Sequence, residues 1–318
     1  MDSILLSLIL ISQVVISFAS SGDSINNGSS SSSSSSSPLP VVLWHGMGDT
    51  CCDPLSLGSV IKLIENQVPS IYVKSLRIGN NVETDFSNGY FMNVNDQISL
   101  ACSLIKSDDK LTNGFNLMGF SQGGQFSRAL VQRCSLPVRN LITLGAQHQG
   151  VYGLPRCTAD TDNGLYSSVC DLVRKLLSMG AYNSFVQKRL VQAQYWHDPL
   201  KESKYKEKSL FLADINNENS SKNETYRSNL VNLNKFVMIM FANDTMVIPK
   251  ESGHFGYYQP GTNDKIVPME DSPLYTDDRL GLKELNDSGK LIKFTVPGDH
   301  CHIKDDWFIN QVINPYLR

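Results

Sequence analysis

The pentapeptide Gly119 to Gly123 constrains the fold of this chain more than any other feature of its sequence. It reads Gly-Phe-Ser-Gln-Gly. The apolar run Phe115 to Met118 precedes it, and a stretch with helical spacing, Gln125 to Arg133, follows it. A strand that turns sharply into a helix through glycines is the context of a nucleophile elbow, in which the turn exposes a serine oxygen to a base. The pentapeptide therefore predicts a serine hydrolase with Ser121 as nucleophile. A glycine-rich turn with an idle serine is the alternative that this motif alone leaves open.

Strand-like and helix-like segments alternate along the chain. The strand-like runs are Pro40–Trp44, Tyr72–Ile78, Phe115–Met118, Leu141–Leu144, Phe236–Phe241 and Leu291–Val296. Segments with helical spacing lie between them at Leu57–Val68, Val94–Ile105 and Gln125–Arg133. This alternation predicts the fold class α/β, with a mainly parallel central sheet and helices on both of its faces. Functional groups in such sheets gather beyond the carboxyl ends of the strands.

The first residues have the features of a targeting segment. Ile4 to Phe18 is apolar and ends in small residues that suit cleavage, so residues 1–19 are expected to be a signal peptide. Asp2 stands in a region where such peptides usually carry Lys or Arg, and a signal anchor is the alternative. No other segment approaches the ~20 apolar residues of a spanning helix, so no further membrane span is expected.

A serine run, Ser29 to Ser37, follows the targeting segment. Serine alone cannot bury apolar surface, so residues 20–37 are expected to form a flexible linker and residues 38–318 the folded domain. The formal net charge of −3 over 318 residues shows no basic surplus that would neutralise many phosphates. Nucleic acid is therefore not an expected partner.

Cysteines and sequons fit the secretory pathway. Seven cysteines become candidates for disulfides in that compartment, and because seven is an odd number at least one is unpaired. Four sequons of the folded domain predict glycosylation at Asn219, Asn223, Asn243 and Asn286.

The acid and the base of a serine hydrolase with this architecture follow the serine in chain order. Asp244 comes just after the strand-like run that ends at Phe241, and His300 comes just after the run that ends at Val296. His300 would take the proton of Ser121, while Asp244 holds the ring and stabilises the imidazolium. Because Asp244 favours the charged ring and so raises the pKa of His300, activity is expected to rise from acidic pH towards neutrality.

A second glycine-rich turn, His45 to Asp49, follows the first strand-like run. Its backbone amides could face a negative oxygen, as half of an oxyanion hole. The amide of Gln122, at the start of the helix after Ser121, would be the other donor. An ordinary tight turn between strand and helix is the alternative.

Other histidines and carboxylates compete for these roles. His254 and His302 are expected at the surface, and His45 is expected to pack or to form a hydrogen bond inside the protein. His148 is expected to line the cleft, and His197 is expected at a packed helix end. Asp287 and Asp299 are the alternatives to Asp244 as the acid, although Asp299 adjoins the histidine that it would have to orient. No HExxH, paired CxxC spacing or P-loop lysine occurs, so neither a metal nor a cofactor is expected.

Six further motifs, together with the two glycine-rich turns, carry a resemblance to a known family. They are Cys51-Cys52, Tyr195 to Pro199, Phe211 to Asn216, Asn243-Asp244, Leu274 to Leu282 and Gly298 to His300. On these motifs the chain resembles the palmitoyl-protein thioesterases from Pro38 to its end. The resemblance implies an α/β-hydrolase fold, with a helical insertion at about 150–233 between the strands that bear the nucleophile and the acid.

The resemblance also implies a reaction and a set of residues. The reaction is removal of long fatty acyl groups, chiefly palmitoyl, from cysteine thioesters of proteins and peptides in lysosomes. The implied triad is Ser121, Asp244 and His300, with the amides of Met47 and Gln122 as oxyanion donors. Implied disulfides join Cys51 to Cys52, Cys102 to Cys134 and Cys157 to Cys170, which leaves Cys301 free.

Two other classes of function stay open. A secreted or lysosomal lipase or carboxylesterase would keep the triad and the fold but prefer oxygen esters. A non-catalytic acyl-binding protein would keep its affinity for palmitate when Ser121 is replaced. The expected partners are S-acylated proteins or peptides and long-chain acyl thioesters, and the expected location is the lysosome, with secretion as the alternative.

Overall fold

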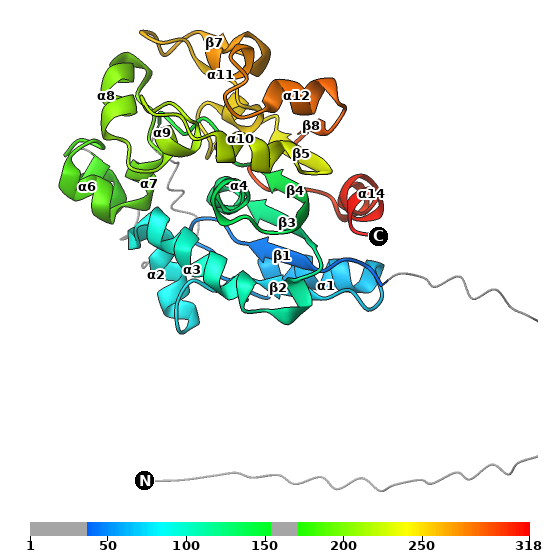
Figure 1. Cartoon of the computed structure of the whole chain (residues 1–318). Helices are drawn as coiled ribbons and strands as arrows, with labels where there is room; N and C mark the ends of the chain where they lie inside the picture. Colours follow the sequence, from blue (N-terminus) through cyan, green and yellow to red (C-terminus); the bar gives the residue numbers. More distant parts are fainter. Residues whose placement is uncertain (1–36, 154–170, 178) are drawn as a thin grey trace, which may run out of the picture. The chain divides into compact units, whose positions relative to one another are not determined.

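Six parallel strands form the central sheet of the part of the chain that the computed structural model describes, residues 37–153, 171–177 and 179–318 (Figure 1). The strands are β1 (Val41–Trp44), β2 (Val73–Ser75), β3 (Phe115–Phe120), β4 (Val138–Leu144), β5 (Lys235–Phe241) and β8 (Leu291–Val296), in the spatial order β2-β1-β3-β4-β5-β8. Every neighbouring pair is parallel. The predicted α/β class is confirmed, and each strand-like run overlaps one of these strands.

Helices join these strands, because parallel neighbours need a crossover connection. The helices are α1 (Leu57–Gln67), α2 (Val82–Phe91), α3 (Val94–Lys106), α4 (Gln122–Cys134), α6 (Ser184–Arg189), α7 (Val191–Gln194), α8 (Glu202–Lys208), α9 (Leu212–Ile215), α10 (Glu224–Val231), α11 (Pro273–Thr276), α12 (Leu282–Asp287), α13 (Asp305–Phe308) and α14 (Asn314–Tyr316). A small antiparallel pair, β6 (Tyr257–Tyr258) and β7 (Ile266–Val267), lies outside the sheet. Helix α4 begins earlier than its apolar spacing predicted, because two glycines in its first turn carry no apolar side chain.

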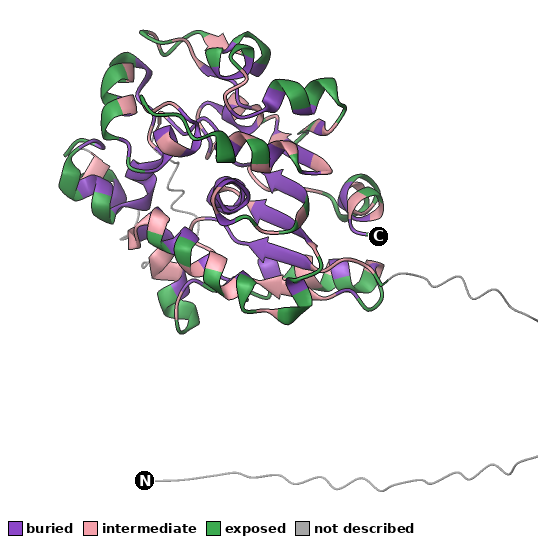
Figure 2. Ribbon diagram, in the orientation of Figure 1, coloured by how far each residue is buried: buried purple, intermediate pink, exposed green. Residues whose placement is uncertain are grey.

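Both faces of the sheet are buried (Figure 2). In β1, Val42 and Trp44 belong to the core that contains α3 and α4, whereas Val41 and Leu43 belong to the core that contains α1 and the C-terminal helices. Successive side chains of a strand point to opposite faces, so each strand supplies both cores. Parallel strands covered in this way have near-continuous apolar sequences, which is why the sequence pattern located all six.

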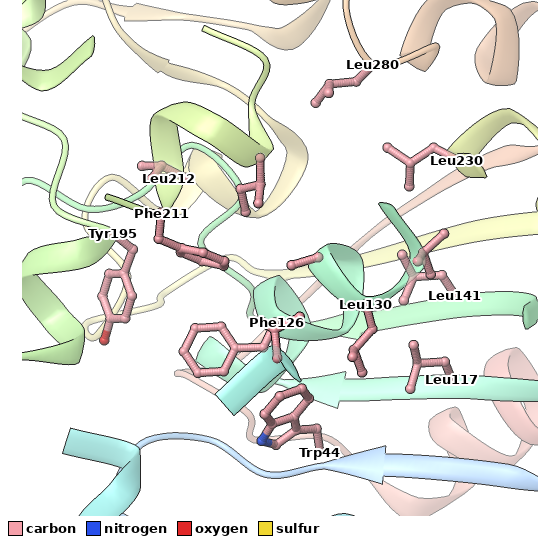
Figure 3. Packing of buried hydrophobic residues seen from close by; sticks show 14 of the residues in the cluster. Trp44, Leu117, Phe126, Leu130, Leu141, Tyr195, Phe211, Leu212, Leu230 and Leu280 are labelled. Carbon is pink, nitrogen blue, oxygen red and sulfur yellow. The ribbon is translucent and has the colours of Figure 1, made fainter. Parts of the chain in front are cut away.

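Helix α4 lies between the sheet and the segment that joins β4 to β5. All of its residues except Arg133 are buried. The ring of Phe126 packs edge-on against Trp44 of β1, with 5.4 Å between ring centroids, and against Phe211, with 5.7 Å between centroids (Figure 3). The helix that follows Ser121 is therefore fixed on two sides by large aromatic side chains.

The chain between β4 and β5 contains α6 to α10 and a helical run at residues 171–177. Among the described cysteines, disulfides join Cys51 to Cys52 and Cys102 of α3 to Cys134 of α4, and Cys301 is free. The expected signal peptide, the linker up to residue 36, and Cys157 and Cys170 lie outside the described residues. Within the described ranges, no helix is both long enough and apolar enough to span a membrane.

Candidate active site

The strand order brings the segments of the predicted site to one edge of the sheet. The chain runs from β1 outward to β2 and then crosses back to β3, on the other side of β1. The carboxyl ends of β1 and β3 therefore flank the point at which the strand order reverses, where ligands bind in open α/β sheets. The turn at 45–49 follows β1 and Ser121 follows β3, while Asp244 and His300 follow β5 and β8.

Ser121 occupies a strained turn between β3 and α4. Its φ of +54° lies in the left-handed region, which residues other than glycine rarely adopt. A Cβ atom on Gly119 would lie 2.3 Å from the carbonyl oxygen of Gly123, and a Cβ atom on Gly123 would lie 2.3 Å from that of His45. The amide of Ser121 donates to the carbonyl of Leu144 at 2.7 Å. This is the geometry of a nucleophile elbow, and it requires glycine at 119 and 123.

The carboxylate of Asp244 orients the ring of His300. Its Oδ2 atom lies 2.7 Å from Nδ1 of His300. Its Oδ1 atom accepts the backbone amides of Met246 and Val247, each at 2.9 Å. With one oxygen held by the backbone, Asp244 can present the other to the ring in only one direction. This pairing occupies Nδ1 of His300 and leaves Nε2 for a reacting group.

The surroundings of His300 favour its charged form. Burial alone would lower the pKa of His300, but the neighbouring Cys301 sulfur and the hydrogen bond and charge of Asp244 outweigh burial and raise that pKa. A raised pKa means that His300 holds its proton over a wider pH range than a free histidine.

Two cavities meet at Ser121. The larger, of about 510 Å³, is lined by Ser121, His300 and Met47, together with apolar side chains of α1. The smaller, of about 40 Å³, is lined by Ser121 and Met47 and by side chains of the segment between β4 and β5, among them Leu177 and Trp196. The serine thus borders both a space that contains the histidine and an apolar space beneath the inserted helices.

Met47 and Gln122, the candidate oxyanion donors, are fixed through their side chains. The amide nitrogen of the Gln122 side chain donates to the carbonyl of Gly89 in α2 at 3.0 Å. The sulfur of Met47 accepts from Nε2 of Gln192 in α7 at 3.1 Å. Gln122 is also the first residue of α4, and the first N–H groups of a helix have no acceptor within it. Both residues are thereby held in place beside Ser121 by helices outside the sheet.

A buried ion pair supports the turn that contains Met47. His45 Nε2 lies 3.1 Å from Oδ1 of Asp85, and His45 Nδ1 lies 2.9 Å from the carbonyl oxygen of Gly46. Both ring nitrogens face acceptors, so both carry protons. Burial opposes charge on each partner, but the hydrogen bond and the opposite charge outweigh it, raising the pKa of His45 and lowering that of Asp85. Asp85 also accepts the amide of Cys51 at 2.8 Å, so it anchors both ends of the turn.

The sequence analysis missed Asp85. It lies within α2, far from any strand end, and its carboxylate is completely buried. The signal that could have found it is indirect: a histidine expected inside the protein, as His45 was, needs an acceptor there.

Comparison with known proteins settles the family. A sequence profile described as palmitoyl protein thioesterase matches residues 40–300. The chain belongs to the palmitoyl-protein thioesterase family. Palmitoyl-protein thioesterase 1 of Caenorhabditis elegans is 49% identical over 88% of this chain and 92% of its own length. Palmitoyl-protein thioesterase 3 of Dictyostelium discoideum is 37% identical over 88% and 92%. The lysosomal thioesterase PPT2 homolog of Drosophila melanogaster is 32% identical over 87% and 91%.

Asp299, the first alternative to Asp244 as the acid, binds backbone amides in this member of the palmitoyl-protein thioesterase family. Its Oδ1 accepts the amide of His300 at 2.7 Å and the amide of Thr245 at 2.9 Å. Asp299 therefore joins the loop of the acid to the loop of the histidine and does not face the imidazole. Asp287, the other alternative, is exposed at the end of α12.

The remaining histidines of this palmitoyl-protein thioesterase take no part in the site, with one at its rim. His148 is fully buried and stacked on Phe255, so its expected place in the cleft wall was wrong. His254 is half-buried, with Nε2 near two strand carbonyls, which corrects its expected surface position. His197 is stacked between two tyrosine rings. His302 is exposed, as expected, and borders the larger cavity.

The sequon asparagines of this family member lie at or near the surface. Asn223, Asn243 and Asn286 are exposed, and Asn219 is half-buried. Asn243 faces solvent although the side chain of Asp244 next to it is only 2% exposed. Within the described ranges no cluster of three or more His, Cys, Asp or Glu side chains could hold a metal ion.

Proposed function

We propose that this chain is a serine thioesterase that removes long fatty acyl groups, chiefly palmitoyl, from cysteine residues of proteins or peptides. The observation that carries the proposal is the strained Ser121 elbow, which shares a cavity with a histidine held by Asp244. Membership of the palmitoyl-protein thioesterase family supports the choice of substrate. The triad in this proposal is Ser121, Asp244 and His300.

The reaction passes through an acyl-enzyme. His300 takes the proton of Ser121 as the hydroxyl oxygen attacks the thioester carbonyl, and the amides of Met47 and Gln122 hold the oxyanion. The carbon–sulfur bond then breaks, and the cysteine leaves as a thiol with the proton that His300 took from Ser121, so that His300 is neutral again. A thiol has a pKa of about 8.5, so the departing sulfur needs less protonation by His300 than an alkoxide would. Water, activated by His300, hydrolyses the acyl-enzyme and releases the fatty acid.

The acyl chain has a proposed place as well. The smaller cavity begins at Ser121 and is walled by apolar side chains, among them Leu177 and Trp196, so it is the proposed entrance for the chain. The larger cavity, with His300, would receive the peptide and its thiol. Leu177→Trp should then shift preference towards shorter chains. At ~0.8 kcal/mol per buried CH₂, losing room for two carbons corresponds to about 15-fold in relative kcat/KM.

The control for this prediction is Val60→Trp, which fills the larger cavity instead. Hydrolysis of a series of S-acyl peptides of increasing chain length measures both variants. A change of chain-length preference in Val60→Trp but not in Leu177→Trp would place the acyl chain in the larger cavity.

The lysosome is the proposed place of action. Several relatives, among them the Drosophila melanogaster protein, carry the name lysosomal thioesterase. Three of the four sequon asparagines of the folded domain are exposed, as glycosylation requires. The proposed role is the degradation of lipidated proteins, and the exposed asparagines are the proposed glycan sites.

Hydrolysis of an S-palmitoyl peptide and of its O-palmitoyl serine analogue tests the function directly. The purified mature chain should cleave the thioester rapidly, and Ser121→Ala should abolish the reaction. Preference for the oxygen ester would assign the chain to the lipases or carboxylesterases. Palmitate binding without turnover of either substrate would identify a non-catalytic acyl-binding protein.

A further inference from the structure

The helical run 171–177 and the segment 179–189, which contains α6, are together called the hairpin. The run 171–177 and α6 each turn one side inward, where Val173 and Val186 are buried in one cluster with Tyr90. Met47 of the turn after β1 and Leu177 are partly buried against the same cluster. Leu177 also lines the smaller cavity beside Ser121. The inward side of the hairpin is therefore part of the wall between the proposed acyl site and solvent.

The outward side of the hairpin exposes several large apolar side chains, whereas a surface helix is normally polar there. Leu172 is 44% exposed, Met179 is 57% exposed and Phe185 is 49% exposed. Seven large apolar side chains are exposed among the described residues, and three of the seven lie within this short segment. Single exposed apolar residues are ordinary, but a group of them marks a surface that meets a partner or a membrane.

Positive charge accompanies these apolar side chains. Residues 171–189 contain four basic residues, Arg174, Lys175, Lys188 and Arg189, and one acidic residue, Asp171. The guanidinium of Arg189 lies 4.5 Å from the centroid of the Phe185 ring, so cation and aromatic ring present one surface. The chain as a whole has a net charge of −3, so this local excess runs against the overall balance. A polar side rich in Lys and Arg beside exposed Phe, Leu and Met is typical of segments that lie in the interface of an anionic membrane.

We propose that the outward side of this hairpin docks on the surface of an anionic lipid bilayer. We call this surface the docking face and define it by Leu172, Arg174, Met179, Phe185, Lys188 and Arg189. The proposal rests on the proposed function, because a long acyl chain on a protein is buried in a bilayer before an enzyme removes it. Docking would set the cavity wall against the lipid, so that the chain passes from one apolar environment to the other with little exposure to water.

Charge and apolar contact make separate contributions to such docking. A basic residue close to an anionic membrane surface strengthens binding about fivefold, and salt weakens this attraction. Loss of the two cations of Lys188→Glu/Arg189→Glu should therefore weaken binding about 25-fold, and the new repulsion should weaken it further. Phe185→Ser should weaken binding without changing its salt dependence.

Vesicle co-flotation of the full mature chain carrying Ser121→Ala tests the proposal without turnover. The vesicles are phosphatidylcholine alone and an equal mixture of phosphatidylcholine and phosphatidylserine, in mildly acidic buffer at low and high salt. Lys62→Glu/Lys283→Glu is the matched charge control, because both lysines are exposed and lie on α1 and α12. Val82→Ser, at a side chain 42% exposed on α2, is the matched apolar control.

The expected result is salt-sensitive binding to the mixed vesicles that the docking-face variants lose and the two controls keep. Absence of binding to the mixed vesicles would overturn the proposal, and so would equal losses in Lys62→Glu/Lys283→Glu. If the docking-face variants bind vesicles normally but lose binding to an acidic peptide, the face recognises protein and the proposal is wrong. Hydrolysis of a water-soluble acyl thioester by the chain with Ser121 intact separates the two proposals. Failure there with docking retained would remove the proposed function alone.

Discussion

At the scale of single residues, each member of the candidate triad is held by backbone groups. Two backbone amides orient Asp244, and the carbonyl of Leu144 accepts the amide of Ser121 and so anchors that residue. Asp299 accepts the amides of Thr245 and His300 and so joins the two late loops. Groups held in this way need no rearrangement when charge develops during the reaction, which lowers the cost of reaching the transition state.

The pH profile of kcat/KM tests the acid–base pair. His300 must be neutral to accept a proton, and its raised pKa means that activity falls as pH drops through that pKa. Activity on a soluble acyl thioester should therefore rise from acid towards neutrality. Asp244→Asn should reduce kcat by about 10³- to 10⁴-fold, because the ring loses its orientation and its charge partner.

Cys301→Ala is a second test of this profile. The Cys301 sulfur contributes to the raised pKa of His300, so its removal should move the acid limb to lower pH without abolishing activity. An activity already flat and maximal in strongly acidic buffer would contradict the assignment of His300 as the base.

Residue positions differ in how far the sequence predicts them. Asp244 and His300 could be chosen because parallel strands bring their carboxyl ends to one edge, and each residue follows a strand. The same rule does not identify Asp85, because that residue lies within α2 and not at the end of a strand. The elbow itself was recognisable because its steric demands leave glycine at fixed offsets from Ser121.

At the scale of secondary-structure elements, α4 is the element that the site depends on most. It begins directly after Ser121 and is buried along nearly its whole length. Its apolar spacing predicted one buried side, but the helices between β4 and β5 cover the other side as well. These contacts join α4 to residues far away in the sequence, so the apolar spacing within α4 could not predict them.

Gly123→Ala tests how closely the elbow is packed. The added Cβ would lie 2.3 Å from the carbonyl oxygen of His45, a backbone atom that cannot turn aside. The variant should lose about 3 kcal/mol or more of unfolding free energy, measured by urea denaturation. Gly89→Ala is the matched control, because its Cβ would meet only the Gln122 side chain, at 3.4 Å. Equal stability of Gly123→Ala and the wild type would show that the elbow can relax.

The variant Arg128→Met tests how much the contacts between α4 and the helices that join β4 to β5 contribute to stability. Its guanidinium is fully buried and donates to the carbonyls of Ile215 and His148, at 3.0 and 3.1 Å, and to Oδ1 of Asn216 at 2.7 Å. Burial lowers the pKa of Arg128 to about 9. Arg128→Met would remove the donor to the His148 carbonyl and to Oδ1 of Asn216, although Gln132 Nε2 would still donate to the Ile215 carbonyl at 2.6 Å. Because buried acceptors lose their donor, the variant should cost about 3 kcal/mol or more in unfolding free energy.

Arg133→Met provides the comparison for Arg128→Met within the same helix. Arg133 is partly exposed and pairs with Asp214, and ion pairs in such positions contribute about 0–1 kcal/mol. Urea denaturation of the two variants should therefore give clearly different losses. Similar losses would mean that Arg128 contributes no more than a surface arginine.

At the scale of the whole described domain, the predicted architecture holds because its strands are buried on both faces. Continuous apolar runs gave the strand positions, and their alternation with helical segments gave the parallel sheet. The exposed apolar side of residues 171–189 could not be predicted in this way. A local sequence with apolar residues at helical spacing does not say which of them a neighbouring helix will cover.

Stability of the domain should depend on pH through the His45–Asp85 pair. The raised pKa of His45 stabilises the fold below the ordinary histidine pKa, and this contribution is lost as pH rises through the raised value. The lowered pKa of Asp85 stabilises the fold above the ordinary aspartate pKa, and this contribution is lost as pH falls through the lowered value. Both contributions are therefore complete between about pH 4 and about pH 6.5.

The Tm difference between the wild type and Asp85→Asn, measured across pH, checks this window. It should be largest in mildly acidic buffer and smaller on either side. Asp277→Asn removes an exposed carboxylate paired with Arg279 and should show no such window. A difference that keeps growing into alkaline buffer would contradict the ion pair.

The edge position of β8 has a consequence for synthesis of the protein. A ribosome completes the serine and the oxyanion turn long before it reaches the last strand, which pairs only with β5 and precedes His300. On the proposed mechanism, the growing chain is therefore inactive until the codon for His300 has been translated. A premature stop codon anywhere upstream of His300 should produce a null allele, even when most of the sheet has already been made.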